Sequence, residues 1–143
     1  MQLAQSQVPA DIDIVVNVPE DLVLPMDAQR LQEVFINLII NATHSIEGCG
    51  CITIRAEKDA NAGEICIEVR DTGHGIPEEI QGQLFDPFYT TKEEGKGTGL
   101  GLSVAYGIIQ KHQGNIAVQS CPGQGASFFI RLPVERTNNN GIV

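Results

Sequence analysis

Residues 51–71 constrain the fold most, because apolar and polar side chains alternate through two successive segments there. The apolar positions on either side of the turn-forming residues 59–63 are Ile52, Ile54, Ala56, Ile65, Ile67 and Val69. A period of two is the period of a β-strand, and the turn residues between the segments indicate a hairpin. We therefore predict strands at 51–58 and 64–71, in an antiparallel sheet that is buried on one face.

Residues 27–46 show the period of an amphipathic helix. The side chains at helical spacing that would face a core are Leu31, Val34, Phe35, Leu38, Ile39 and Ala42. Asp27 is a good N-cap, so the helix is predicted to begin just after it. The opposite edge carries Glu33, Asn37 and Asn41, which are four residues apart and therefore lie on one stripe.

The remaining elements follow from similar patterns. They are strands at 12–18, 115–120 and 127–133 and a helix at 102–113 that is closed by Gly114. Residues 71–101 are rich in glycine, proline and threonine, with one short helical candidate near 77–84, and a loop this long is usually functional or mobile. The elements fit a single domain over 1–143, with a core at about 10–134 and a frayed tail at 135–143.

Composition indicates one soluble globular domain of 143 residues, with 42% hydrophobic and 19% charged residues. The net charge of −9 argues against a nucleic-acid partner and means that a polyanionic ligand would need local charge compensation. No apolar stretch approaches the ~20 residues of a membrane span, so we expect no direct membrane contact. The four cysteines lack zinc-site spacing and are expected to be reduced, as in a cytosolic domain.

The glycine run at residues 95–101 (Gly-Lys-Gly-Thr-Gly-Leu-Gly), just before the second helix, is suited to cradle phosphate. Glycines let backbone N–H groups approach an oxyanion, and the helix N-terminus adds a favourable dipole. The run departs from the P-loop pattern, because Gly97 follows Lys96 where that pattern has serine or threonine. It also does not follow a strand, as a dinucleotide-binding fingerprint would. Alone it is a weak signal.

Two further features are candidates for binding chemistry. Asn41 offers a carbonyl oxygen, which is a suitable hard ligand for Mg²⁺. The simpler interpretation of Asn37 and Asn41 is a pair of solvent-facing or capping amides. Asp71 ends a strand before two glycines, and its carboxylate could accept a hydrogen bond from adenine N6 while the glycines let a flat base approach. The alternative is an ordinary Asp-x-Gly turn.

Together these segments resemble the histidine kinases of the GHKL ATPase superfamily. The matching motifs are residues 37–42 (the N box), 71–77 (the first glycine box), 84–92 (the F box), 97–102 (the second glycine box) and 123–128 (the closing glycine turn and final strand). They occur in the family's order and spacing, from about Asp27 to Pro133. One box alone is a modest signal, whereas five in order are very specific.

The resemblance implies an α/β (α+β) two-layer sandwich, in which helices cover one face of a mixed, mainly antiparallel sheet, with a mobile ATP lid. It also implies ATP and Mg²⁺ as cofactors, with Asn41 as the Mg²⁺ ligand and Asp71 holding adenine. The other residues that would contact the nucleotide are Gly73, Gly75, Ile76, Lys96, Gly97, Thr98, Gly99, Leu100, Gly101 and Ser127.

The reaction implied by the resemblance is attack by a histidine imidazole on the γ-phosphate of ATP. Asn37 stands where gyrase and mismatch-repair relatives place a glutamate that activates water. Because an amide cannot act as a general base, the chain is expected to favour transfer over hydrolysis. Lys92 would neutralise phosphate charge from the lid, and Glu33, one turn before Asn37, could assist.

The sequence departs from the family pattern at two positions. Pro87 replaces the arginine of another large subgroup, so the F box, with Thr-Thr-Lys at 90–92, resembles that of nitrogen-regulation-type kinases. Ala126 stands where relatives often carry a threonine that reaches adenine through water. Ser127 would point to the other face of a regular strand, which predicts weaker adenine binding.

The acceptor-histidine hairpin of a histidine kinase is expected to be absent from this chain, and His44, His74 and His112 are interpreted as surface residues. The implied partners are that hairpin in the parent protein and the receiver domain of a response regulator. The chain alone is expected to be monomeric and cytoplasmic, and its parent could be membrane-anchored. Two alternatives remain: a serine kinase of the anti-sigma type, which the F box argues against, and a degenerate ATP-sensing module, which the intact boxes argue against.

Overall fold

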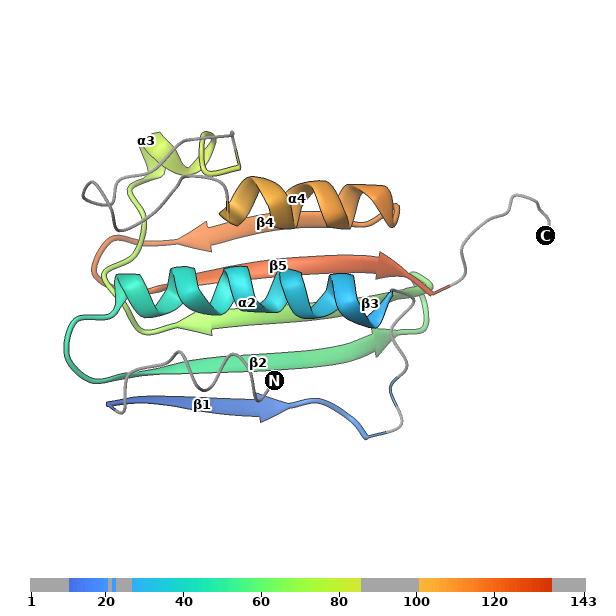
Figure 1. Ribbon diagram of the computed structural model, residues 1–143, viewed down its shortest axis with the longest axis horizontal. Coiled ribbons are helices and arrows are strands. Elements are labelled where there is room, and N and C mark those ends of the chain that lie inside the picture. The colour runs from blue at the N-terminus through green and yellow to red at the C-terminus, as the bar shows by residue number, and fades with distance from the viewer. Residues whose placement is uncertain (1–10, 21, 23–26, 86–100, 135–143) are drawn as a thin grey trace.

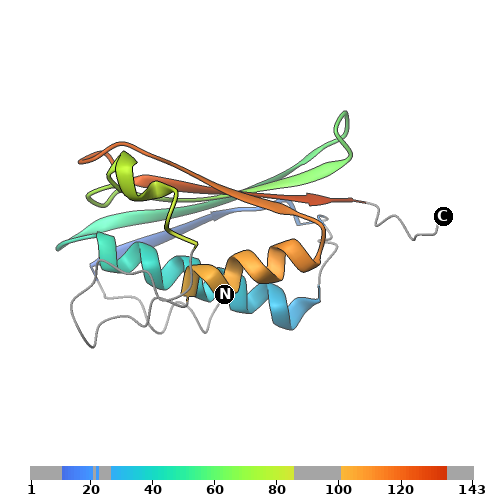
Figure 2. The ribbon, with the colours of Figure 1, turned by 90° about the horizontal axis from the view of Figure 1, so that it is seen from above.

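The computed structural model describes residues 11–20, 22, 27–85 and 101–134. The strands are β1 (Ile12–Asn17), β2 (Gly50–Asp59), β3 (Glu64–Asp71), β4 (Asn115–Ser120) and β5 (Ala126–Pro133), and the helices are α2 (Ala28–Ser45), α3 (Glu78–Gln81) and α4 (Gly101–Lys111). The strands form one sheet in the order β1-β2-β3-β5-β4, in which β1 and β2 are parallel and the other neighbours antiparallel. Helices α2 and α4 cover one face (Figures 1 and 2), which confirms the predicted two-layer sandwich.

The alternating residues of β2 and β3 form the centre of the core, as their period predicts. All six of them face the helices and are at most 9% exposed. Residues at the same spacing in β5 join them, namely Phe128, Ile130 and Leu132. The helix layer contributes mainly α2 residues, with Ala105 and Ile109 from α4. The sheet therefore has one apolar face under the helices and one polar face.

Helix α2 begins and ends close to where the sequence predicts. Asp27 is the N-cap, because its Oδ1 accepts a hydrogen bond of 2.9 Å from the backbone N–H of Gln29. The apolar stripe is buried at Val34, Phe35, Leu38, Ile39 and Ala42, and Leu31 is partly buried against it. The helix ends at Ser45, which positions this residue against the end of β3.

The C-terminus of α4 corrects one detail of the sequence interpretation. The helix ends at Lys111, and the residue in the left-handed region is Gln113, with a φ of 64°, instead of Gly114. The N–H of Gly114 donates to the carbonyl of Ile109 at 2.9 Å, which completes a Schellman-type end. Gly114 is needed for a different reason: a Cβ there would lie 2.5 Å from the carbonyl oxygen of Arg131.

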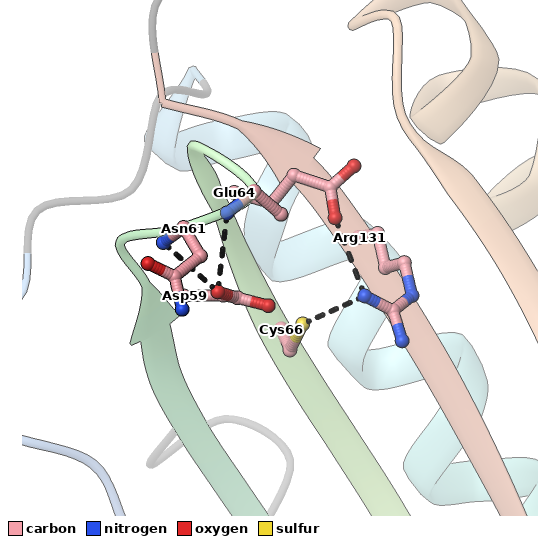
Figure 3. A network of polar contacts seen from close by, with 6 residues as sticks. Asp59, Asn61, Glu64, Cys66 and Arg131 are labelled. Carbon is pink, nitrogen blue, oxygen red and sulfur yellow. Dashed lines mark hydrogen bonds and ion pairs between the residues drawn. The ribbon is translucent and has the colours of Figure 1, made fainter.

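Polar side chains on the polar face of the sheet form hydrogen bonds and an ion pair near the β2–β3 turn (Figure 3). Arg131 of β5 places Nη1 at 3.3 Å from Glu64 Oε1 and at 3.3 Å from Cys66 Sγ, both on β3. Within the turn, Asp59 Oδ1 accepts hydrogen bonds from the N–H groups of Asn61 and Ala62. The Arg131 contacts join β3 to β5 at the end of the strand pair opposite to Asp71, which pairs with Ala126.

Two predictions from composition can be compared with the structure. All four cysteines carry free thiols. Over the described ranges, no helix combines the length and the apolar character that crossing a membrane requires.

Candidate functional site

A row of side chains crosses the sheet at the end where β3 stops. The strand registers pair Asp71 of β3 with Ala126 of β5, and Ala126 with Ser120 of β4. Because paired residues of neighbouring strands point to the same face, all three side chains lie on the helix-covered side. Asp71 is only 3% exposed, so the row places a buried carboxylate at the edge of the core.

Hydrogen bonds from neighbouring segments hold the Asp71 carboxylate. Its Oδ1 accepts from the N–H of Gly73 at 2.8 Å and lies 3.2 Å from Ser45 Oγ. The Ser45 hydroxyl also lies 2.9 Å from the carbonyl of Ala42, so its single proton is shared. Burial raises the pKa of Asp71, although hydrogen bonds from Gly73, Ser45 and Ala126 partly oppose this shift. The carboxyl group is therefore preorganised as a hydrogen-bond partner inside a low-dielectric site.

A cavity of about 320 Å³ opens beside Asp71. Its lining combines the end of α2, the loop after β3 and the start of β5: Asn41, His44, Ser45, Asp71, His74, Gly75, Ile76, Pro77, Leu84 and Ala126. This volume is at the small end of the range of ligand pockets, ~300 to 1,000 Å³. Apolar walls with a few convergent polar groups suit a flat heterocycle that carries a hydrogen-bond donor.

The glycines around the cavity are required because backbone packs against backbone there. A Cβ on Gly73 would collide with Ser45, and one on Gly75 would collide with the carbonyl of Cys121. Gly75 and Gly125 also have φ values of 80° and 87°, which glycine adopts readily. A Cβ on Gly125 would in turn collide with the carbonyl of Asp71. The glycines thus let the loop after β3 lie directly against α2 and the β4–β5 turn.

The structure brings together a subset of the predicted site residues. Asn41, Asp71, Gly75 and Ile76 line the cavity, and Gly73 is bonded to Asp71. Asn37 and Glu33 lie one and two turns before Asn41 on α2 and are not among the lining residues. Gly101 is the first residue of α4. The remaining predicted residues, Lys92, Lys96, Gly97, Thr98, Gly99 and Leu100, lie outside the described ranges.

Ser127 lies on the opposite face of the sheet from the cavity. Its hydroxyl donates to Glu68 Oε2 at 2.9 Å, on the polar face. Its neighbour Ala126 is 5% exposed and lines the cavity, as the strand period predicts for adjacent residues. Ser127 is therefore separated from Asp71 by the sheet, and position 126 is the one from which a β5 side chain reaches the cavity.

Several lining residues were not identified as site residues from the sequence. The sequence indicates that His44 and His74 are surface residues; both are exposed, and both also lie on the cavity wall. Helical spacing gave a signal for His44, because it follows Asn41 by three residues and so shares its face of α2. Leu84 belongs to the F-box match, but its place on the cavity wall depends on how the chain after α3 returns to the core.

Comparisons with known proteins agree with this architecture. Residues 26–136 match the family described as histidine kinase-, DNA gyrase B-, and HSP90-like ATPase. Sporulation kinase A of Bacillus subtilis (strain 168) is 45% identical over 107 residues, which are 75% of this chain and 17% of that protein. The chain spans about a fifth of the length of the curated relatives it matches.

Solved structures show the same fold. The catalytic domain of the histidine kinase ThkA matches with a TM-score of 0.79 and 33% identity, over 92% of this chain and 86% of that one. Full-length ShkA in complex with AMPPNP matches with a TM-score of 0.75 and 27% identity, over 92% of this chain and 28% of that one.

Proposed function

This chain belongs to the family of histidine kinase-, DNA gyrase B-, and HSP90-like ATPases, and from this membership we propose that its cavity binds the adenine end of ATP. The observation that carries the proposal is the buried carboxylate of Asp71 at the cavity wall. A carboxylate oxygen accepts a hydrogen bond from the exocyclic amine of adenine. The apolar side chains of Ile76, Leu84 and Ala126 would enclose the ring. The ShkA structure, which contains AMPPNP, supports a nucleotide in this fold.

Mg²⁺ is proposed to bind through Asn41 and the phosphates. Among the described residues, no group of three or more His, Cys, Asp or Glu side chains could hold a metal ion. Mg²⁺ does not need such a group, because it keeps several waters and takes its remaining ligands from substrate phosphates. The amide oxygen of Asn41, on the cavity wall, fits the role of its one protein ligand. The ion would neutralise charge on the phosphates.

The proposed reaction is transfer of the γ-phosphate to a histidine of a separate helical hairpin, from which a response regulator would receive it. Asn37 has no carboxylate to activate water, which favours transfer over hydrolysis. Glu33 forms an ion pair of 3.0 Å with Arg30 on the surface of α2, so any assistance from it would require this pair to open. Lys92, Lys96 and residues 97–101 are proposed to contact the phosphates.

The finer assignments are also proposals. The Thr-Thr-Lys sequence at 90–92 suggests the nitrogen-regulation-type subgroup, but it lies outside the described residues. We propose that residues 1–143 form one monomeric catalytic domain, which acts in the cytoplasm and contacts no nucleic acid. The net charge of −9 supports the last point.

The experiment that tests this function is phosphotransfer in trans. The chain is incubated with Mg·ATP labelled at the γ-phosphate and with the acceptor-histidine hairpin of its parent protein. We expect an acid-labile label on the hairpin, which is lost when the acceptor histidine is replaced or when Asn41→Ala is used. Acid-stable label on a serine would support an anti-sigma-type kinase instead. Nucleotide binding without any transfer would support a degenerate ATP-sensing module.

A further inference from the structure

The backbone of Ile76 is held by two side chains from separate segments. Its N–H donates to Ser120 Oγ at 2.7 Å, and its carbonyl accepts from Gln81 Nε2 at 2.9 Å. Ile76 precedes Pro77, which restricts its backbone to extended conformations. Because its side chain lines the cavity, these two hydrogen bonds determine where one wall of the cavity lies.

The same two side chains also bind the β4–β5 connection. Gln81 Nε2 donates to the carbonyl of Ser120 at 3.2 Å, and the Ser120 hydroxyl donates to the carbonyl of Gly125 at 2.7 Å. The Ser120 hydroxyl therefore acts as acceptor and donor at once, while one Gln81 nitrogen spans two carbonyls. Three segments are joined in this way: the loop after β3, the helix α3 and the β4–β5 turn.

Ser120 connects this arrangement to Asp71 through the sheet. It is the last member of the row in which Asp71 pairs with Ala126 and Ala126 with Ser120. A nucleobase that is hydrogen-bonded to Asp71 would also pack against Ile76. Ser120 and Gln81 would therefore set the distance between the two residues that contact the base. The loop and the turn also meet directly, since the N–H of Gly123 donates to the carbonyl of His74.

We infer that Gln81 and Ser120 are positioning residues for the nucleotide, which act through the backbone of Ile76. This inference rests on the proposed binding of ATP at Asp71. Gln81 is half-buried in the short helix α3, so loss of its hydrogen bonds leaves the core in place. The expected consequence is a wider, less ordered cavity wall and weaker nucleotide binding in a protein that remains folded.

The test measures the affinity of the full chain for Mg·ATP by titration calorimetry, with the melting temperature of each variant determined separately. Gln81→Met keeps the length of the side chain and removes its donors. Ser120→Ala removes the hydroxyl, and Ser120→Thr restores it. Gln119→Ala is the matched control, because its exposed side chain lies on the same strand and on the other face.

Gln81→Met and Ser120→Ala should each weaken binding by about three- to tenfold, the effect that one or two neutral hydrogen bonds carry. Ser120→Thr and Gln119→Ala should bind like the wild type. The double variant should lose less than the product of the two single losses, because both hydrogen bonds hold the same residue.

Wild-type affinity in Gln81→Met would overturn the inference, even if Ser120→Ala failed to fold. The same holds if Ser120→Thr binds as weakly as Ser120→Ala, because the loss would then come from altered packing and not from the hydroxyl. A wild-type chain that binds no Mg·ATP would overturn the proposed function itself, so the two failures are distinguishable.

Discussion

Ser45 Oγ and Asp71 Oδ1 lie 3.2 Å apart, although the two residues are separated by 26 positions in the sequence. This contact joins the last residue of α2 to the last residue of β3. It brings the helix that carries Asn41 and the strand that carries the buried carboxylate to the same cavity. Helix α2, whose apolar side chains are buried in the core, therefore sets the distance between Asn41, the proposed Mg²⁺ ligand, and Asp71, the proposed adenine-binding residue.

The raised pKa of Asp71 predicts a pH-dependent stability that Asp71→Asn removes. A carboxyl whose folded-state pKa lies above the unfolded value of 3.8 stabilises the fold most below that value. This contribution is lost as pH rises through the folded-state pKa, because the folded protein must then bury a charge. The wild type should therefore lose unfolding free energy relative to Asp71→Asn as the pH of urea titrations rises above 3.8. Parallel pH profiles would contradict the prediction.

Asn41→Ala should remove the effect of Mg²⁺ on ATP binding. If the amide oxygen is the protein ligand of the ion, the variant should bind ATP no better with Mg²⁺ than with a chelator, whereas the wild type should bind better with the ion. Titration calorimetry under both conditions measures this difference. Gln32→Ala, an exposed position on the same helix, is the control and should keep the effect. An Asn41→Ala variant with an undiminished Mg²⁺ effect would place the ion elsewhere.

Ala126→Ser should tighten ATP binding, whereas Ser127→Ala should leave it unchanged. The first change adds a hydroxyl that points into the cavity beside Asp71. The second removes a hydroxyl that is bonded to Glu68 on the opposite face. One added neutral hydrogen bond corresponds to a gain of about two- to tenfold in affinity. If Ala126→Ser bound ATP no more tightly than the wild type, the side chain at position 126 would not contact the bound nucleotide, and the prediction would be contradicted.

Gly123→Ala and Gly125→Ala should destabilise the fold to different degrees. Both glycines have a positive φ, so a side chain at either position costs about 1 to 2 kcal/mol. A Cβ on Gly123 meets no atom within 4 Å, but one on Gly125 collides with the carbonyl of Asp71. Urea unfolding should therefore show a larger loss for Gly125→Ala, and this variant alone should also bind ATP more weakly. Equal losses of unfolding free energy in the two variants would contradict the expected collision between a side chain at position 125 and the carbonyl of Asp71.

The elements that could be predicted from the sequence are those whose signal is local. The period of two around Ile54 and Ile67, the helical stripe through Leu38 and the N-cap at Asp27 each depend on neighbours only a few residues away. The placement of Asn41 and Asp71 on one site followed from the resemblance to a family, because nothing local connects these two residues. The left-handed end of α4 was missed because Gln113, unlike glycine, gives no conformational signal.

The features of the site that the sequence did not predict depend on pairing between strands that are far apart in the sequence. Strand β5 lies between β3 and β4, and this order puts Ala126 beside Asp71 and Ser120. No periodicity in the sequence encodes that neighbourhood. The same is true of Gln81, whose hydrogen bond to Ser120 spans 39 positions. The hydrogen bonds that shape the cavity wall could therefore be found only in the structure.

The central claim is that the cavity beside Asp71 binds Mg·ATP, and a thermal melt with and without this ligand tests it most directly. At 100 times its dissociation constant, a ligand that binds only the folded state adds about 2.7 kcal/mol of stability. We predict a clear upward shift of the wild-type melting temperature that Asp71→Asn abolishes and that Asn41→Ala reduces to the shift given by ATP without Mg²⁺. A folded wild type whose melting temperature does not change, or a shift that survives in Asp71→Asn, would contradict the account.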